Sequence, residues 1–266
     1  MSEVRFDASK ASLNSLRNQS PYWGVHAARY QFAKPHVVNS LVLDIACGTG
    51  YGLPILKTRA RVVVGVDVDL EAVRKARLAI GSGPESLITA DGCRLPFPDA
   101  TFDAITSFET LEHLETRTEF LAELRRVLKP QGLCIISTPN AIYTRPVDGK
   151  PRNPHHIFEY TPVELTEELG NHFAEVEMLG QTLAPRYVMS PFLEDQQRLP
   201  RTPRVMTRVA LWRVINKLPI GVRDHLSNAL WGHPLFPGDE DYDFSHATVA
   251  EAPVLVALCR KLVTTE

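Results

Sequence analysis

The chain has 266 residues, of which 44% are hydrophobic, and a formal net charge of −2 at pH 7. This length suits one large α/β domain, and the mild charge without a long basic run disfavours a strong electrostatic interaction with nucleic acid. The polar N-terminus and the lack of an apolar stretch of about 18 residues predict neither a signal peptide nor a membrane span. Four scattered cysteines without a CxxC spacing are typical of a reducing, cytoplasmic location.

Short apolar runs alternate with helical patterns from residue 41 to residue 181. The predicted strands cover 41–46, 61–67, 86–91, 102–108, 133–139 and 173–181. The predicted helices cover 51–60, a segment that begins at Asp69, 114–128 and a segment that begins at Thr161. At the last of these, Pro162 and Glu164 complete a capping box with proline at the first helical position. Strands that alternate with helices predict a doubly wound parallel sheet.

Residues 183–250 interrupt this alternation with proline clusters and two helical patterns, one around Val205 to Ile215 and one over 222–231. VLVALCRKL at 254–262 then returns as a strand. The sequence therefore predicts a single domain, with a C-terminal helical appendage and no final strand as the alternative. Its parts are lead-in helices at 1–36, a cofactor-binding core at 37–182, a helical insertion at 183–250 and a last strand within 251–266.

A glycine-rich loop follows the first strand in LDIACGTGYG. Its glycines, Gly48, Gly50 and Gly52, form G-x-G-x-G, whereas the dinucleotide fingerprint requires its third glycine at the position of Leu53. Asp44 would repel a pyrophosphate, but it suits a ligand that carries an ammonium group and no phosphate. S-adenosylmethionine (SAM) is such a ligand.

Two further acids follow the next two strands. Asp67 can accept hydrogen bonds from both ribose hydroxyls of an adenosine, and Asp91, followed by Gly92, can accept from the adenine amino group. Each acid alone would be explained as a helix cap or a solvated turn residue. Three acids at the ends of three successive strands, around one glycine loop, indicate a ligand site at the carboxyl edge of the sheet.

The segments VLDIACGTGYG, GVD, DGCRLPFPDATFDAI and LRRVLKPQGLCIISTPN resemble the class I SAM-dependent methyltransferases over residues 41–181. VHAARYQFA at 25–33 is similar to the lead-in helix of a bacterial subgroup that often acts in polysaccharide and sugar biosynthesis. The resemblance implies a seven-stranded Rossmann-like sheet with an antiparallel last strand. It also implies SAM-binding roles for Arg29, Asp44, Ala46, Gly48, Gly50, Asp67, Val68, Asp91, Gly92 and Phe108. Tyr30 is an alternative to Arg29 near the SAM carboxylate, and a solvated Arg29 is a further alternative.

SFETLEHL at 107–114 follows the fourth strand. On a helix start, Glu109, Glu112 and His113 would share one face and point into the crevice of methyl transfer. A helix N-terminal acid with a histidine partner is the alternative explanation. NPHHIFEYT at 153–161 closes the loop after the fifth strand, so one or both of its histidines would reach the same crevice.

This pairing is similar to the metal site of small-RNA 3′-terminal ribose 2′-O-methyltransferases, and ubiquinone-pathway O-methyltransferases have a comparable E-x-x-E-H. The resemblance implies a divalent cation, Mg²⁺ or Mn²⁺, on Glu109, Glu112, His113 and His156. Such a cation would lower the pKa of an acceptor hydroxyl. His113, Glu109 and His156 are the predicted catalytic residues. In the metal-free alternative, His113 or His156 is a general base that Glu109 or Glu112 orients.

These features predict a cytoplasmic SAM-dependent O-methyltransferase that acts on a sugar hydroxyl of a saccharide or polysaccharide precursor. The overall pattern is similar to the sugar methyltransferases of methylmannose polysaccharide biosynthesis. The alternatives are RNA ribose 2′-O-methylation, a phenolic or quinone acceptor, and a non-enzymatic SAM-binding regulator. Residues 183–250 are expected to form the acceptor-side wall, although Trp212 and Trp231 individually are expected to pack in a core. The sequence leaves a homodimer open.

Overall fold

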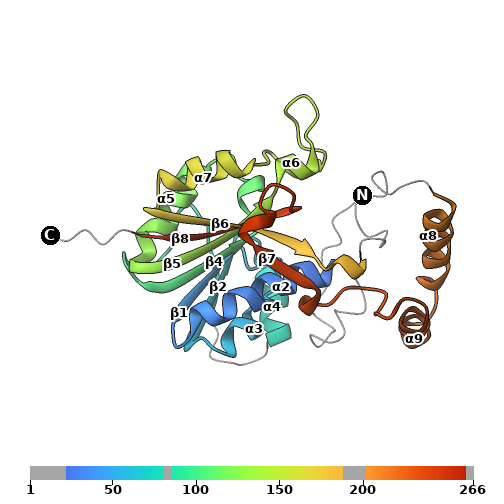
Figure 1. Ribbon diagram of the computed structural model, residues 1–266. Helices are drawn as coiled ribbons and strands as arrows, with labels where there is room; N and C mark the ends of the chain where they lie inside the picture. Colours follow the sequence, from blue (N-terminus) through green and yellow to red (C-terminus); the bar gives the residue numbers. More distant parts are fainter. Residues whose placement is uncertain (1–21, 81–85, 188–201, 262–266) are drawn as a thin grey trace. The chain divides into compact units, whose positions relative to one another are not determined.

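A computed structural model describes residues 22–80, 86–187 and 202–261 of the chain. They form two compact units (Figure 1). The larger unit contains Arg29–Thr182 and the residues from Phe244 onward, and the smaller contains Leu183–Asp243 and a short segment that ends at Ala28. The predictions for 1–21, 188–201 and 262–266 lie outside the described residues. None of the described helices combines the length and the apolar character that a bilayer span requires.

The larger unit is built on a mixed sheet with the strand order β3-β2-β1-β4-β5-β8-β6-β7. β1 to β5 pair in parallel, whereas β8 runs antiparallel to both β5 and β6. The chain order reverses between β1 and β4, and open α/β sheets bind their ligands at such a switch point. The strands are β1 (Leu41–Ile45), β2 (Val62–Asp67), β3 (Ser86–Thr89), β4 (Phe102–Phe108), β5 (Leu128–Pro139), β6 (Glu175–Leu183), β7 (Tyr242–Ser245) and β8 (Val254–Arg260).

The sheet has eight strands where the sequence predicted seven. The additional strand, β7, lies beside β6 at the edge of the sheet, within the segment that was predicted to be helical. Its sequence, Tyr-Asp-Phe-Ser, has the period-2 alternation of a half-buried strand, but four residues give too short a pattern to stand out from a loop. Phe244 of β7 stacks on Phe32 of α2 (Trp23–Ala33) with ring centroids 4.4 Å apart. The predicted antiparallel last strand is confirmed.

Helices cover both faces of the sheet (Figure 1). α3 (Leu53–Lys57) and α4 (Leu70–Ile80) lie on one face, and α5 (Arg117–Val127) and α7 (Pro162–Gly170) lie on the other. The short α6 (Ala141–Thr144) follows β5. α5 and α7 contribute buried side chains to the main core, which include Phe120, Leu124 and Leu165. The capping box at the start of α7 is confirmed, because Thr161 accepts from the Glu164 amide and the Glu164 side chain accepts from the Thr161 amide.

The smaller unit contains both helices that the sequence predicted there, α8 (Pro203–Ile215) and α9 (Ile220–Trp231). Its core is a small cluster of Ile215, Leu235 and Phe236, with Trp212 and Trp231 packed against it. Both tryptophans therefore have the core role that the sequence favoured for each of them.

Candidate active site

The glycine loop after β1 turns through left-handed backbone conformations. Gly48 has a φ of 56° and Gly50 a φ of 73°, values that glycine adopts without steric cost, and Ala46 also has a positive φ of 57°. The loop is tied to the end of β2, because the Gly48 amide donates to Asp67 Oδ2 at 2.7 Å. Asp67 Oδ1 accepts from the Asp69 amide at 2.9 Å. A carboxylate has about four acceptor sites, so Asp67 retains capacity for a ligand.

Asp44, Asp67 and Asp91 lie at or near the carboxyl ends of β1, β2 and β3. These strands pair in parallel, with Asp44 opposite Gly65 and Asp67 opposite Thr89. Asp91 follows β3, and its Oδ1 accepts from the Cys93 amide at 2.9 Å. The three acids therefore share one edge of the sheet, beside the glycine loop, as the sequence predicted.

Asp44 is buried with only 1% of its surface exposed. Thr106 Oγ1 donates to its Oδ1 at 2.6 Å, and the Tyr30 hydroxyl donates to its Oδ2 at 3.1 Å. Burial raises the pKa of Asp44 to about 7, although both hydrogen bonds oppose this rise. A cationic ligand nearby would restore the ionised form, because an opposite charge lowers the pKa of a carboxyl group.

Tyr30 connects the lead-in helix α2 to the glycine loop. Its ring makes edge contacts with Tyr51, at a centroid distance of 5.4 Å, and with Phe108, at 4.9 Å. Gly52 makes this packing feasible, since a Cβ on Gly52 would lie 2.1 Å from atoms of the Tyr30 ring. The third glycine of the loop is therefore required for space rather than for a positive φ.

Gly52→Ala is expected to lower the free energy of unfolding by about 1–3 kcal/mol, because the added methyl group overpacks a buried contact. Gly52 has a φ of −78°, which alanine adopts without strain, so the backbone conformation does not add to the loss of stability. Urea denaturation measures the change. Gly170→Ala is the control, since no atom lies within 4 Å of its added Cβ. Equal stability of the two variants would contradict a structural role for the Gly52–Tyr30 contact.

Arg29 is 1% exposed, so the alternative of a solvated Arg29 is wrong. Its Nη1 lies 3.1 Å from Glu109 Oε1 and 3.4 Å from Gln181 Oε1. The guanidinium group thus joins α2 to the E-x-x-E-H segment rather than pointing into solvent.

Two other predicted SAM residues differ in burial: the side chain of Val68 is 73% exposed, whereas Phe108, at the end of β4, is buried. A Cβ on Gly92 would lie 2.7 Å from the Phe120 ring.

The E-x-x-E-H segment does not begin a helix, and that prediction was wrong. Glu109 has a left-handed φ of 52°, a short 3₁₀ turn covers Leu111–His113, and α5 begins only at Arg117. The two acids consequently diverge. Glu109 accepts from Ser137 Oγ at 2.9 Å and pairs with Arg29, whereas the fully buried Glu112 accepts from Thr138 Oγ1 at 3.0 Å.

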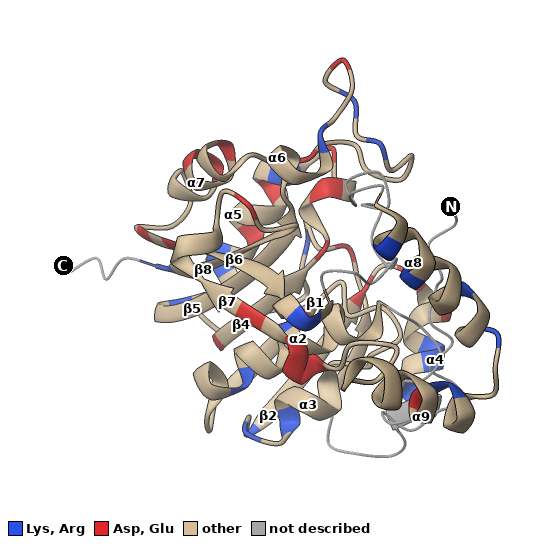
Figure 2. Cartoon of the chain, turned by 45° about the vertical axis from the view of Figure 1, so that its right-hand side comes forward, with Lys and Arg blue, Asp and Glu red and all other residues tan. Residues whose placement is uncertain are grey.

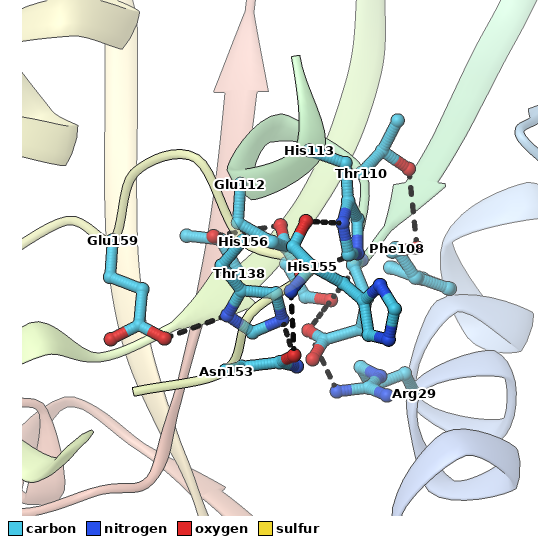
Figure 3. Close-up of polar contacts among 12 residues, drawn as sticks. Arg29, Phe108, Thr110, Glu112, His113, Thr138, Asn153, His155, His156 and Glu159 are labelled. Atoms are coloured by element: carbon cyan, nitrogen blue, oxygen red, sulfur yellow. Dashed lines mark hydrogen bonds and ion pairs between the residues drawn. The ribbon is translucent and has the colours of Figure 1, made fainter. Parts of the chain in front are cut away.

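Glu112, His113 and His156 converge, and each offers one ligand atom within 4.8 Å of the others (Figure 3). The imidazole rings meet edge to face, with centroids 4.9 Å apart. Glu112 Oε1 is buried without a hydrogen-bond partner in the described part of the chain, and His113 Nε2 lies 4.0 Å from it, too far for a hydrogen bond. Burial and then the charge of Glu109 raise the pKa of Glu112.

This group fits a divalent cation. A buried carboxylate oxygen without a partner, facing two imidazoles, supplies the mixed oxygen and nitrogen ligands that Mn²⁺ and related cations accept. Glu109 is not part of this group, and its Oε1 instead contacts Arg29 and Ser137. Three of the four predicted metal ligands are therefore close together.

Both histidines present the same ring nitrogen to the group. His113 Nδ1 lies 2.8 Å from the His155 carbonyl oxygen, and His156 Nδ1 lies 2.7 Å from Glu159 Oε1. Because these oxygens can only accept, each Nδ1 is the donor, and in the neutral ring each Nε2 keeps a lone pair. Glu159 was missed by the sequence reasoning, and so was the use of His155 through its carbonyl rather than its ring. The spacing of His156 and Glu159 in HIFE was the available signal.

The histidine loop is anchored to the turn that carries Glu112. The amides of Ile157 and Phe158 donate to the Glu112 carbonyl at 2.7 and 3.3 Å. These bonds hold residues 153–158 over the end of β4, and the two histidines meet as a result.

Three comparisons relate the chain to known proteins. A family model described as a methyltransferase domain matches residues 43–136. A Mycobacterium tuberculosis protein named "Probable S-adenosylmethionine-dependent methyltransferase" is 36% identical over 167 residues, which are 62% of this chain and 60% of that protein. The chain thus matches about 60% of the length of that relative.

A ubiquinone biosynthesis O-methyltransferase from Xanthomonas oryzae pv. oryzae is 30% identical over 178 residues, which are 60% of this chain and 73% of that protein. The crystal structure of a SAM-dependent methyltransferase from Archaeoglobus fulgidus shares the fold with a TM-score of 0.54 at 17% identity, and the match covers 96% of this chain and 97% of that one. The chain belongs to the family of SAM-dependent methyltransferases.

Proposed function

We propose that this protein transfers the methyl group of SAM to an acceptor hydroxyl, with SAM bound at the carboxyl edge of β1, β2 and β3. The observation that carries the proposal is the alignment of Asp44, Asp67 and Asp91 beside a left-handed glycine loop. Asp67 would accept from the ribose hydroxyls and Asp91 from the adenine amino group. Asp44 would face the positively charged part of SAM.

Asp67→Ala is expected to weaken SAM binding at least about tenfold, because each charge-assisted hydrogen bond to the ribose contributes roughly 1.5–3 kcal/mol before compensation. Isothermal titration calorimetry with SAM and S-adenosylhomocysteine measures the loss. Asp103→Ala is the matched control, since Asp103 also binds a backbone amide, that of Leu41 at 2.8 Å, but lies near the start of β4. Unchanged affinity in Asp67→Ala would remove Asp67 from the site.

We further propose that methyl transfer is assisted by a divalent cation held by Glu112, His113 and His156. A hydroxyl is a weak nucleophile near neutral pH, and a bound cation supplies the positive charge that lowers its pKa. Glu112 would contribute the negative charge that retains the cation, while the His155 carbonyl and Glu159 hold the two rings. Glu109 would hold the turn that carries Glu112 and His113 next to α2, through its ion pair with Arg29.

The acceptor that suits such a site is a sugar of a saccharide or polysaccharide precursor. Neighbouring sugar hydroxyls form a diol, which can take two open coordination positions of one cation. RNA is disfavoured, because the chain carries 29 basic and 31 acidic residues, and both signs are interspersed over the larger unit (Figure 2). The fact that a relative is named a ubiquinone biosynthesis O-methyltransferase keeps phenolic acceptors as the second candidate.

A methyl-transfer assay against mono- and oligosaccharides, catechols and short RNAs distinguishes these acceptors. Turnover on saccharides, with diols preferred over isolated hydroxyls, is expected. Faster turnover on catechols would assign the protein to phenolic acceptors. SAM binding without turnover on any of the three classes would contradict an enzymatic role.

A further inference from the structure

One of the nitrogen atoms that face the candidate cation site is already engaged. His156 Nε2 lies 2.8 Å from Asn153 Nδ2 (Figure 3). The orientation of the Asn153 amide follows from its other end, because Asn153 Oδ1 accepts from the His155 amide at 3.0 Å. Nδ2 is therefore a donor, and it occupies the Nε2 lone pair that a cation would use.

Glu159 binds the opposite side of the same ring, at Nδ1. Glu159 is 5% exposed, its Oε1 lies 2.7 Å from His156 Nδ1, and its Oε2 accepts from Thr144 Oγ1. Burial favours the neutral form of Glu159, but the hydrogen bonds from His156 and Thr144 outweigh this effect and lower its pKa. The ring of His156 thus lies between a fixed carboxylate and an amide on a partly exposed loop.

We infer that Asn153 is a displaceable internal substitute for the cation, while Glu159 is the positioning residue that keeps His156 ready to bind it. Without a cation, the Asn153 amide satisfies Nε2. Rotation of the Asn153 side chain releases the lone pair, and the Glu159 bond keeps the ring aimed at Glu112 and His113. This inference rests on the metal-assisted function proposed above.

The two neighbours of His156 should consequently change cation affinity in opposite directions. Removing the Asn153 amide abolishes a bond that must break before the cation binds, so Asn153→Ala is expected to tighten cation binding about 2–10-fold. Neutralising Glu159 weakens the hydrogen bond that orients the His156 ring, and it lowers the basicity of His156 Nε2. Glu159→Gln is therefore expected to weaken cation binding at least about tenfold. A merely structural role for these residues would not produce opposite signs.

Titration of the 266-residue chain with Mn²⁺, followed by electron paramagnetic resonance in the absence of SAM and acceptor, tests the inference. Asn153→Ser is the second variant: its hydroxyl can still accept from the His155 amide, but it is too short to reach His156, so it should also tighten binding. Asn171→Ala, at the exposed end of α7, is the control and should match the unmodified protein.

Unchanged or weaker Mn²⁺ binding in both Asn153 variants would overturn the inference, and weaker binding would instead make Asn153 a ligand. Absence of Mn²⁺ binding in every variant would also overturn it. Calorimetry with SAM on the same preparations separates these results from a failure of the methyltransferase proposal, because the proposed SAM site does not include Asn153 or Glu159.

Discussion

Exhaustive removal of divalent cations is expected to lower methyl transfer at least about a hundredfold, with SAM affinity unchanged. The physical reason is the state of Glu112, whose Oε1 is buried without a hydrogen-bond partner among the described residues and faces two imidazoles. A cation would satisfy this oxygen and would activate the acceptor hydroxyl. Turnover is measured after treatment with EDTA and again after re-addition of Mn²⁺ or Mg²⁺. Elemental analysis confirms that the treated protein is metal-free.

Two variants of the acidic pair sharpen this experiment. Glu112→Gln preserves the shape of a fully buried side chain and removes its charge, so it should cause the same loss as chelation. Glu109→Gln should lower Mn²⁺ affinity much less than Glu112→Gln does, because Glu109 Oε1 contacts Arg29 and Ser137 and only the charge of Glu109 acts on the cation group. Full turnover by protein that is confirmed to be metal-free would contradict the role of a cation and would leave His113 or His156 as a general base.

The arrangement of the three acids around the glycine loop, where we propose that SAM binds, could be predicted from the sequence because its determinants are local. Each acid stands at the end of its own apolar run, and parallel strands bring those ends to one edge without further information. The glycine loop needs left-handed backbone at Gly48 and Gly50, which the sequence itself indicates. The core strands and α7 were predictable for the same reason.

The acceptor side was harder to predict because its arrangement depends on tertiary contacts. A helix start was expected at Glu109, but a left-handed residue and a 3₁₀ turn send Glu109 and Glu112 in different directions. The burial of Arg29 and its pairing with Glu109 join segments that are distant in the sequence. No periodicity in either segment could specify that pair.

The histidine loop combines both cases. Its position beside the turn that follows β4 could be predicted from the strand order, but the roles of its side chains could not. The hydrogen bonds of His156 to Asn153 and Glu159 all lie within NPHHIFEYT, so they could be considered from spacing alone. Which of these possible hydrogen bonds form depends on the hydrogen bonds between the loop and the Glu112 carbonyl, and only the structure reveals those.

Asp44→Asn is expected to stabilise the ligand-free protein and to weaken SAM binding at the same time. Burial raises the pKa of Asp44 from 3.8 to about 7, so between these values the folded state binds more protons than the unfolded state. Stability in ligand-free protein therefore falls as the pH rises through this range. An asparagine carries no charge to desolvate, so its advantage should grow from near zero around pH 4 to about 1–3 kcal/mol above pH 7.

The same substitution removes the charge that would face the cationic part of SAM. SAM affinity is expected to fall at least about tenfold, because a charged partner in a buried site contributes more than a neutral amide. Chemical denaturation at pH 5 and pH 8, together with calorimetry of SAM binding at pH 8, measures both effects.

A stability gain that does not depend on pH would show that the charge of Asp44 does not destabilise the folded state. Unchanged SAM affinity would place the ligand's positive charge elsewhere. If both expected changes are found, the destabilising carboxylate in β1 is explained by the ligand that it binds.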